Sequence, residues 1–296
     1  MGSEARIAPA SWLRLETSVI EIIRIKMIRI LTKYCISSTL PLVSYDLGLN
    51  YSRQSEFMAL VRYGKITNSL EKREIVLLRA FPCKWGRCSF CTYIDDNSTD
   101  EDAIDRTNFK VLEMVTGEFE VLEVINSGSC FEIPTATLEF LKEIVVAKKI
   151  RKLYFEAHWS YRHRLDEFRN FFCVPITFIT GIETFDDDFR NRVLKKGIAF
   201  KDIDEVKSYF QSICLMVGIE GQTKDMISRD IDILIKNFDH GTVNLFVENE
   251  SGIKPDLELQ KWFRENYAWL ENEKKIDVLW KNTDFGVGAE ESESSR

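Results

Sequence analysis

The stretch Glu74–Cys91, which reads EIVLLRAFPCKWGRCSFC, joins an apolar run to a loop that contains three cysteines. The run Glu74–Ala80 has the length and the aliphatic composition of a buried strand. The loop that follows it places Cys83, Cys88 and Cys91 within nine residues. Because sulfur is a soft ligand, this cluster of thiols predicts a metal or redox site directly after the strand.

Apolar runs of strand length recur along the chain and alternate with stretches of helical spacing. The further runs are Val121–Asn126, Lys152–Ala157, Pro175–Gly181, Ile213–Ile219 and Thr242–Val247, and Ile276–Trp280 offers one more. Helical spacing of apolar residues occurs in Thr135–Val146 and in Lys224–Phe238. Strands that alternate with helices indicate an α/β fold with a parallel sheet or a partial barrel.

Polar or cysteine-rich segments follow the strand-like runs. They are Cys83–Cys91, Asn126–Ser129, Glu156–His158, Thr180–Glu183, Gly218–Gln222 and Glu248–Glu250. In parallel α/β folds the carboxyl ends of the strands meet at one rim, where ligands bind. We therefore expect all of these segments to contribute to a single site.

The composition of the chain excludes several classes of protein. Its 296 residues are 45% hydrophobic and 29% charged, which provides enough apolar material for a folded core. Forty basic and 47 acidic residues give a net charge of −7, which argues against a protein that coats nucleic acid. Seven cysteines, an odd number in a long chain, argue against a secreted disulfide scaffold and favour the reducing cytoplasm.

The two ends of the chain are expected to lie outside the main domain. We assign residues 1–70 to an N-terminal extension that is partly helical or disordered, residues 71–285 to the main domain, and residues 286–296 to an acidic tail. Val19–Leu31 is rich in isoleucine, but its charges and short length argue against a membrane span or a signal peptide. Met27 offers a second start for the chain.

The cysteine loop allows two kinds of metal centre. Three thiolates can hold three irons of a [4Fe–4S] cluster and leave the fourth iron open, and Gly86 lets the loop turn tightly. The alternative is a zinc site, which would make the protein a non-enzymatic zinc-binding adaptor. Zinc sites commonly add a second close pair of ligands. The chain has no such pair near the loop, and its histidines are His158, His163 and His240.

The loop, with Phe90 just before its last cysteine, resembles the cysteine motif of the radical S-adenosylmethionine (SAM) superfamily. The usual spacing there is Cys-x3-Cys-x2-Cys, and the first gap is one residue longer here. Three later turns are similar to motifs of that family in order and spacing. They are Asn126–Ser129 (NSGS), Gly181–Thr184 (GIET, followed by Arg190 and Lys196-Gly197) and Gly218–Thr223 (GIEGQT). The resemblance covers about residues 74–285 and implies a partial (β/α)6 barrel.

The resemblance implies a [4Fe–4S] cluster and SAM as cofactors, and an electron donor such as flavodoxin or ferredoxin. The implied iron ligands are Cys83, Cys88 and Cys91. The residues implied to bind SAM are Phe90, Ser127, Gly128, Ser129, Glu156, Thr180, Glu183 and Arg190. Some of these have plain structural alternatives, such as core packing for Phe90, helix capping for the serines, and a solvated charge cluster with Asp186–Asp188 for Arg190. We expect Lys195 and Lys196 to form a charge pair at a helix end.

Four phrases, LRAFPCKWGRCSFCTY, INSGSCFE, GIETFDD and NTDFG, look closest to small members of the superfamily that act on 7-deazaguanines. They imply a lyase that uses a 5′-deoxyadenosyl radical to cleave the base queuine to 7-aminomethyl-7-deazaguanine for salvage. An archaeosine-type enzyme that modifies a 7-deazaguanine in tRNA is the alternative. The acidic chain favours a free base over tRNA. The residues expected to contact the substrate are His158, Glu248, Asn249, Asp284 and Phe285, and none is assigned a catalytic role.

Overall fold

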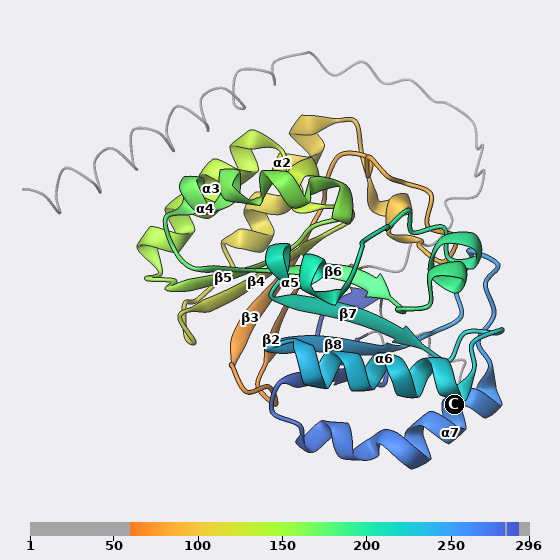
Figure 1. Ribbon diagram of the computed structural model, residues 1–296. Helices are drawn as coiled ribbons and strands as arrows, with labels where there is room; N and C mark the ends of the chain where they lie inside the picture. Colours follow the sequence, from red (N-terminus) through yellow and green to blue (C-terminus); the bar gives the residue numbers. More distant parts are fainter. Residues whose placement is uncertain (1–59, 282, 290–296) are drawn as a thin grey trace, which may run out of the picture. The chain divides into compact units, whose positions relative to one another are not determined.

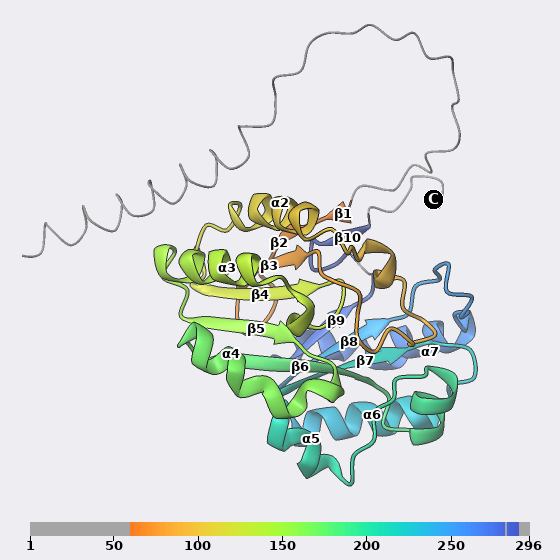
Figure 2. The same cartoon turned by 90° about the horizontal axis from the view of Figure 1, so that it is seen from above.

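The computed structural model describes residues 60–281 and 283–289, and the account below concerns these residues. Their main element is an eight-stranded sheet in the order β2-β3-β4-β5-β6-β7-β8-β9. The strands are β2 (Tyr63–Ile66), β3 (Arg73–Leu78), β4 (Val121–Asn126), β5 (Lys152–Glu156), β6 (Ile176–Glu183), β7 (Ser212–Val217), β8 (His240–Leu245) and β9 (Ile276–Leu279). β2 and β3 are antiparallel, and every later pair is parallel. The sheet curls into a partial barrel with helices on its outer face (Figures 1 and 2).

Helices connect the parallel strands. The α-helices are α2 (Glu101–Leu112), α3 (Thr135–Ala147), α4 (Leu165–Phe172), α5 (Ile203–Tyr209), α6 (Lys224–Asn237) and α7 (Leu257–Tyr267). Shorter turns are η1 (Tyr93–Asp96), η2 (Cys130–Glu132), η3 (Trp159–Arg164), η4 (Phe189–Val193) and η5 (Ala268–Asn272). Side chains of Asp100, Asp202, Thr223 and Asp256 cap α2, α5, α6 and α7, and so fix where each loop ends. Within the described residues, none of the helices combines the length and the hydropathy of a membrane span.

The predicted partial barrel is confirmed, and each predicted run overlaps with one of the strands β3 to β9. β2 lies inside the range that we assigned to the extension, because a strand of four residues leaves no clear periodic pattern. β1 (Leu60–Val61) pairs with β10 (Gly288–Ala289), so paired strands occur on both sides of residues 71–285. The rest of the expected extension, with Val19–Leu31 and Met27, and residues 290–296 of the expected tail lie outside the described residues.

The two faces of the sheet have different cores, because successive side chains of a strand point to opposite sides. On the outer face, Val76 and Leu78 of β3 belong to the large apolar core that includes buried residues of the helices. On the inner face, Ile75 and Leu77 pack with Ile66 and with Val287. The chain after β9 therefore contributes to the inside of the barrel.

The amino end of the barrel interior holds a buried group of charges, Arg73, Glu123, His240 and Asp277, which we call the floor network. Arg73 is fully buried and donates to Glu123 over 2.5 Å and to Asp277 over 2.6 Å. His240 Nε2 lies 2.9 Å from Asp277. The Arg73 guanidinium also lies over the ring of Phe285, 5.8 Å from its centroid. Among the described residues, these side chains thus fill the interior at this end.

Candidate functional site

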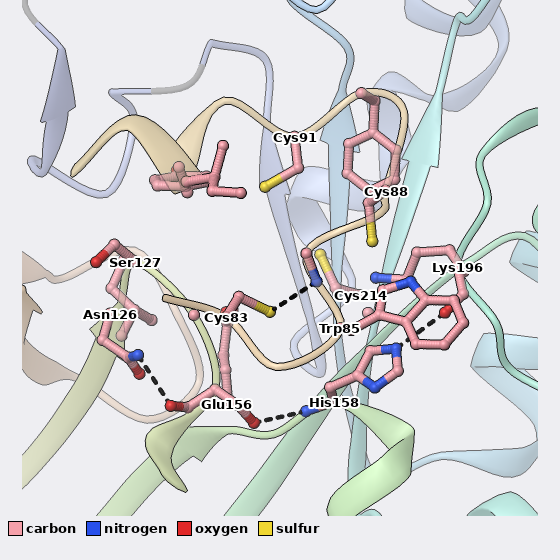
Figure 3. Close-up of a pocket in the computed structure, with 18 of the residues that line it drawn as sticks. Cys83, Trp85, Cys88, Cys91, Asn126, Ser127, Glu156, His158, Lys196 and Cys214 are labelled. Carbon is pink, nitrogen blue, oxygen red and sulfur yellow. Dashed lines mark hydrogen bonds between the residues drawn. The ribbon is translucent and has the colours of Figure 1, made fainter. Parts of the chain in front are cut away.

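A cavity of about 250 Å³ lies at the carboxyl ends of the parallel strands, beside the loop that carries the three cysteines (Figure 3). Its wall includes Asn126–Ser129 after β4, Glu156 at the end of β5, Gly181 and Glu183 of β6, Cys214 and Met216 of β7, and Asn244 of β8. The segments Gly218–Gln222 and Glu248–Glu250, which we expected at the same rim, do not line it. The site is therefore built mainly from the loop and from inward-facing positions of the strands.

The three cysteines of the loop, Cys83, Cys88 and Cys91, are free, half-buried and in the wall of the same cavity. Burial raises the pKa of Cys88 to about 11 and also raises the pKa of Cys91, because it disfavours the charged thiolate. Among the described residues, no three His, Cys, Asp or Glu side chains are placed to hold one metal ion. An iron–sulfur cluster needs no such single point, since each thiolate binds a different iron. The donor set fits a cluster.

Trp85 fastens the cysteine loop to the segment before α5. Its indole Nε1 donates to the carbonyl oxygen of Lys195 over 2.8 Å, and its ring stacks on His158 with centroids 5.3 Å apart. The ring also occupies the space that a Cβ would need at Gly197, where φ is +61°. Ser89 adds a hydrogen bond of 2.7 Å to the carbonyl oxygen of Val193. These contacts set where the thiols lie relative to the strand ends.

The turn Asn126–Ser129 is tied to the ends of two neighbouring strands. Ser127 Oγ accepts a hydrogen bond from the backbone N–H of Ala80 over 3.1 Å, and Ser129 Oγ accepts one from His158 over 2.9 Å. Asn126 donates from Nδ2 to the carbonyl oxygen of Ser129, which leaves its buried Oδ1 without a partner. A buried acceptor without a partner costs stability, so this turn is suited to bind a ligand that donates a hydrogen bond.

Glu183 and Lys196 form an ion pair inside the cavity, with Oε1 and Nζ 2.9 Å apart. Glu183 follows a bulge in β6 and has a φ of +64°, which turns its side chain across the strand. A Cβ at Gly181 would overlap with the Glu183 carboxylate, so the pair depends on this glycine. Glu183 Oε2 is buried and has no partner. The position of Lys196 corrects our expectation of a plain charge at a helix end.

Burial raises the pKa of the half-buried Glu156 to about 7, and the nearby carboxylates of Glu123 and Glu183 add to this rise. The carboxyl group is neutral in both the folded and the unfolded chain below its usual pKa. Between that value and pH 7 the unfolded chain ionises first. The free energy of unfolding therefore falls over this range as pH rises. A cation bound beside Glu156 would favour the charged form.

We predict that Glu156→Gln stabilises the cofactor-free protein at about pH 8 by about 1–3 kcal/mol, because each pKa unit corresponds to about 1.4 kcal/mol and solvent screens a half-buried group. The gain should disappear near pH 4, where the carboxyl group is neutral in both states. Urea unfolding of both proteins at the two pH values measures it. An equal gain at both would show that packing, and not ionisation, is responsible.

Most of the residues expected to bind SAM line the cavity, and two do not. Those that line it are Phe90, Ser127, Gly128, Ser129, Glu156 and Glu183. Thr180 lies on the outer side of β6, because it is two positions from Phe178 and from Ile182. Both of these belong to the core on the helix side of the sheet. Arg190 is buried, and its guanidinium donates to the carbonyl oxygens of Thr184 and Ile198 and to Asp187. The structure thus places neither of these expected SAM contacts, Thr180 and Arg190, in the cavity wall.

Of the residues expected to contact the substrate, His158 alone lines the cavity. Burial lowers the pKa of His158 to about 4, so the ring is neutral and donates from Nε2 to the carbonyl oxygen of Lys196. Glu248 is exposed and pairs with Lys254, and Asp284 is exposed. Asn249 donates to the carbonyl oxygen of Phe90 behind the loop.

Phe285 packs on the inner face with Ile66, Ile75 and Leu77 and does not line the cavity. The structure therefore places none of Glu248, Asn249, Asp284 and Phe285, the other expected substrate contacts, in the cavity wall. They follow strands in the sequence, but the loops direct their side chains to solvent, to the cysteine loop or into a core.

Several cavity residues escaped the sequence analysis as ligand-binding candidates. They are Trp85, Lys196, Cys214 and Met216. Cys214 and Met216 lie inside β7, whereas the polar segments expected at the rim follow the strands. The period of two along β7 was the available signal, because it places Cys214 and Met216 on the same face of the strand.

No protein-family model matches the chain. An uncharacterized protein of Methanocaldococcus jannaschii is 26% identical over 153 residues, which are 46% of this chain and 42% of that protein. The chain thus matches less than half the length of this curated relative. A solved structure of Streptococcus suis SuiB bound to S-adenosylmethionine aligns with a TM-score of 0.41 and 16% identity, over 69% of this chain and 46% of that chain.

A solved structure described as queuine lyase from Clostridium spiroforme bound to SAM and queuine is much more similar. It aligns with a TM-score of 0.76 and 51% identity, over 78% of this chain and 100% of that chain. The barrel and the cysteine-lined cavity described above lie in a chain that matches the full length of this enzyme. The chain therefore belongs to the queuine lyase family of radical SAM enzymes.

Proposed function

We propose that this protein cleaves the free base queuine to 7-aminomethyl-7-deazaguanine, with a [4Fe–4S] cluster and SAM as its cofactors. The observation that carries the proposal is the 51% identity over the full length of a queuine lyase whose structure holds SAM and queuine. The cavity supports it, because three free thiols and several unpartnered polar atoms line one space of about 250 Å³.

In this proposal Cys83, Cys88 and Cys91 hold the cluster. When bound, the cluster and SAM supply the radical chemistry that removes a hydrogen atom from an unactivated carbon. The protein itself binds and orients the two small molecules and keeps water out. Deprotonation of the thiols accompanies iron binding, and burial raises the pKa of two of them, Cys88 and Cys91.

The other cofactor contacts follow from the charges in the cavity wall. The ammonium group of SAM is a donor, so we assign it to the side of the cavity with Asn126 Oδ1, the Ser127–Ser129 turn and the Glu156 carboxylate. Glu183 Oε2 is a free acceptor for a ribose hydroxyl group. Phe90 offers an apolar surface beside the loop for the adenine ring.

The partners of the reaction are part of the same proposal. A free base is favoured over tRNA, because the chain carries a net charge of −7 and the site is a small cavity. An acidic one-electron carrier such as a flavodoxin or a ferredoxin is favoured as reductant by Lys84 and Arg87, two exposed cations on the cysteine loop. The described cysteines are free, which supports a reducing compartment such as the cytoplasm.

An anaerobic assay tests the proposal. The protein is reconstituted with iron and sulfide, reduced, and mixed with SAM. Queuine, tRNA that carries a 7-deazaguanine, or neither of them is then added. We expect 5′-deoxyadenosine to rise with queuine, and 7-aminomethyl-7-deazaguanine to appear with it. If turnover requires tRNA, the substrate is a base in tRNA and not the free base. If the rate of SAM cleavage does not depend on queuine, the protein is still a radical SAM enzyme, but queuine is not its substrate.

A further inference from the structure

The cavity wall holds an unusual share of the unsatisfied polar atoms of the protein. Five buried side-chain nitrogen or oxygen atoms among the described residues have no hydrogen-bond partner. Three of them, Asn126 Oδ1, Glu183 Oε2 and Asn244 Oδ1, belong to residues that line this cavity. Asn126 and Glu183 are assigned above to the cofactor. The Asn244 oxygen has no such assignment, and an unpartnered polar atom in the cavity wall indicates a second ligand.

The position of Asn244 separates it from Asn126. Asn126 ends β4 and Asn244 lies in β8, with β5, β6 and β7 between the two strands. Neighbouring strands are about 4.8 Å apart, so the two side chains lie on different parts of the curled wall. Figure 3 shows the same separation for their neighbours, with Asn126 and Ser127 on one side and Lys196 and Cys214 on the other.

Asn244 also lies deeper than the apolar surface next to the loop. Phe246 follows it by two positions in the chain and packs in one apolar cluster with Ile219 and, from the loop, Phe90. An adenine ring is well accommodated by such a cluster. On the inner side of Asn244, Cys214 packs with Tyr154 and Ile179 in the interior of the barrel. Asn244 thus lies between the apolar cluster and the filled interior.

The side chains of Asn244 and Cys214 are hydrogen-bonded to each other in the cavity wall. Asn244 Nδ2 donates to Cys214 Sγ over 3.1 Å. One N–H and the carbonyl oxygen remain available. A planar amide with a donor beside an acceptor matches a lactam, whose ring N–H and carbonyl oxygen form two hydrogen bonds with it in one plane. Met216, opposite Asn244 in the strand register, adds a polarizable side chain for the ring.

We propose that Asn244 binds the lactam edge of the deazaguanine base, with Cys214 as a positioning residue that orients its amide. The assignment rests on the proposed function, because queuine and 7-aminomethyl-7-deazaguanine carry this edge. It replaces the substrate contacts expected at Glu248, Asn249, Asp284 and Phe285.

The test measures binding without turnover. The probe is 7-aminomethyl-7-deazaguanine, titrated by calorimetry into the unreduced, SAM-loaded protein, and SAM affinity is measured separately. We expect Asn244→Leu to weaken binding of the base by about 10- to 100-fold, the usual range for a lost bidentate contact, and to leave SAM affinity unchanged. Asn266→Leu, the same change at an exposed position of α7, should alter neither.

Asn244→Asp keeps the shape of the side chain and removes its N–H donors. This variant tests the proposed contact with the base if the leucine variant does not fold. It should also lose affinity for the base and keep its affinity for SAM. Wild-type affinity for the base in both variants, or a loss of SAM affinity instead, overturns the assignment. A wild-type protein that binds SAM but not the base overturns the proposed function and the assignment together.

Discussion

Cys88→Ala should abolish both the iron–sulfur absorbance and all cleavage of SAM. Cys83, Cys88 and Cys91 supply the three thiols of the cavity wall that come from one loop, and no fourth cysteine of that loop can replace one of them. A [4Fe–4S] cluster with one open iron needs all three, because each thiolate binds its own iron. The measurements are the visible spectrum and the iron content after anaerobic reconstitution, followed by quantification of 5′-deoxyadenosine.

Cys173→Ala is the matched control for this experiment. Cys173 is also a free thiol, but it is exposed at the end of α4 and does not line the cavity. It should keep its iron and its activity. Normal iron content and full activity in Cys88→Ala would exclude the cluster assignment and the reaction that depends on it. A colourless protein with one zinc ion per chain would favour the zinc-binding adaptor instead.

Arg73→Met should destabilise the protein by about 3–5 kcal/mol, the usual cost of removing one partner from a buried ion pair. The substitution preserves the length of the side chain but leaves the carboxylates of Glu123 and Asp277 without their shared cation. Burial alone would raise the pKa of Asp277, but His240 and Arg73 outweigh it and hold that pKa well below its usual range. Denaturant unfolding of the cofactor-free protein near neutral pH measures the loss.

The control is Arg169→Met, which removes a cation that pairs with the exposed Asp166. Exposed pairs are worth about 0–1 kcal/mol, so this variant should unfold close to the wild type. The double variant Arg73→Met, Glu123→Leu should recover part of the loss, since it also removes one of the stranded charges. If Arg73→Met unfolds like the control, the floor network does not stabilise the barrel.

The repeated strands and the cysteine loop were predictable because both are local in the sequence. A buried parallel strand is a short apolar run, and its period is visible without knowledge of its neighbours. The three thiols are eight residues apart at most, so one loop brings them to one place. Residues directly after strands, such as Ser127 and Glu183, reached the cavity because parallel strands end at one rim.

The rest of the site depends on contacts between distant segments. Lys196 enters the cavity because Glu183, thirteen residues earlier, holds it over Gly181. Asp284 and Glu248 have residue types suited to a base, but the loops that carry them leave both exposed. Asn244 lies inside a strand, where its neighbours in the sequence are apolar or small. The period of two places it on one face of the strand, but it does not tell whether that face lines a cavity or a core.

The contact between Trp85 and Gly197 restricts how this family can vary in sequence. The indole ring occupies the place of a side chain at position 197, so the two positions share one volume although they are far apart in the chain. A larger residue at position 197 would displace the ring from His158 and from the carbonyl oxygen of Lys195. We therefore expect the two positions to depend on each other: homologues that keep the tryptophan should keep the glycine, and where the ring is lost the φ of +61° still favours glycine at position 197.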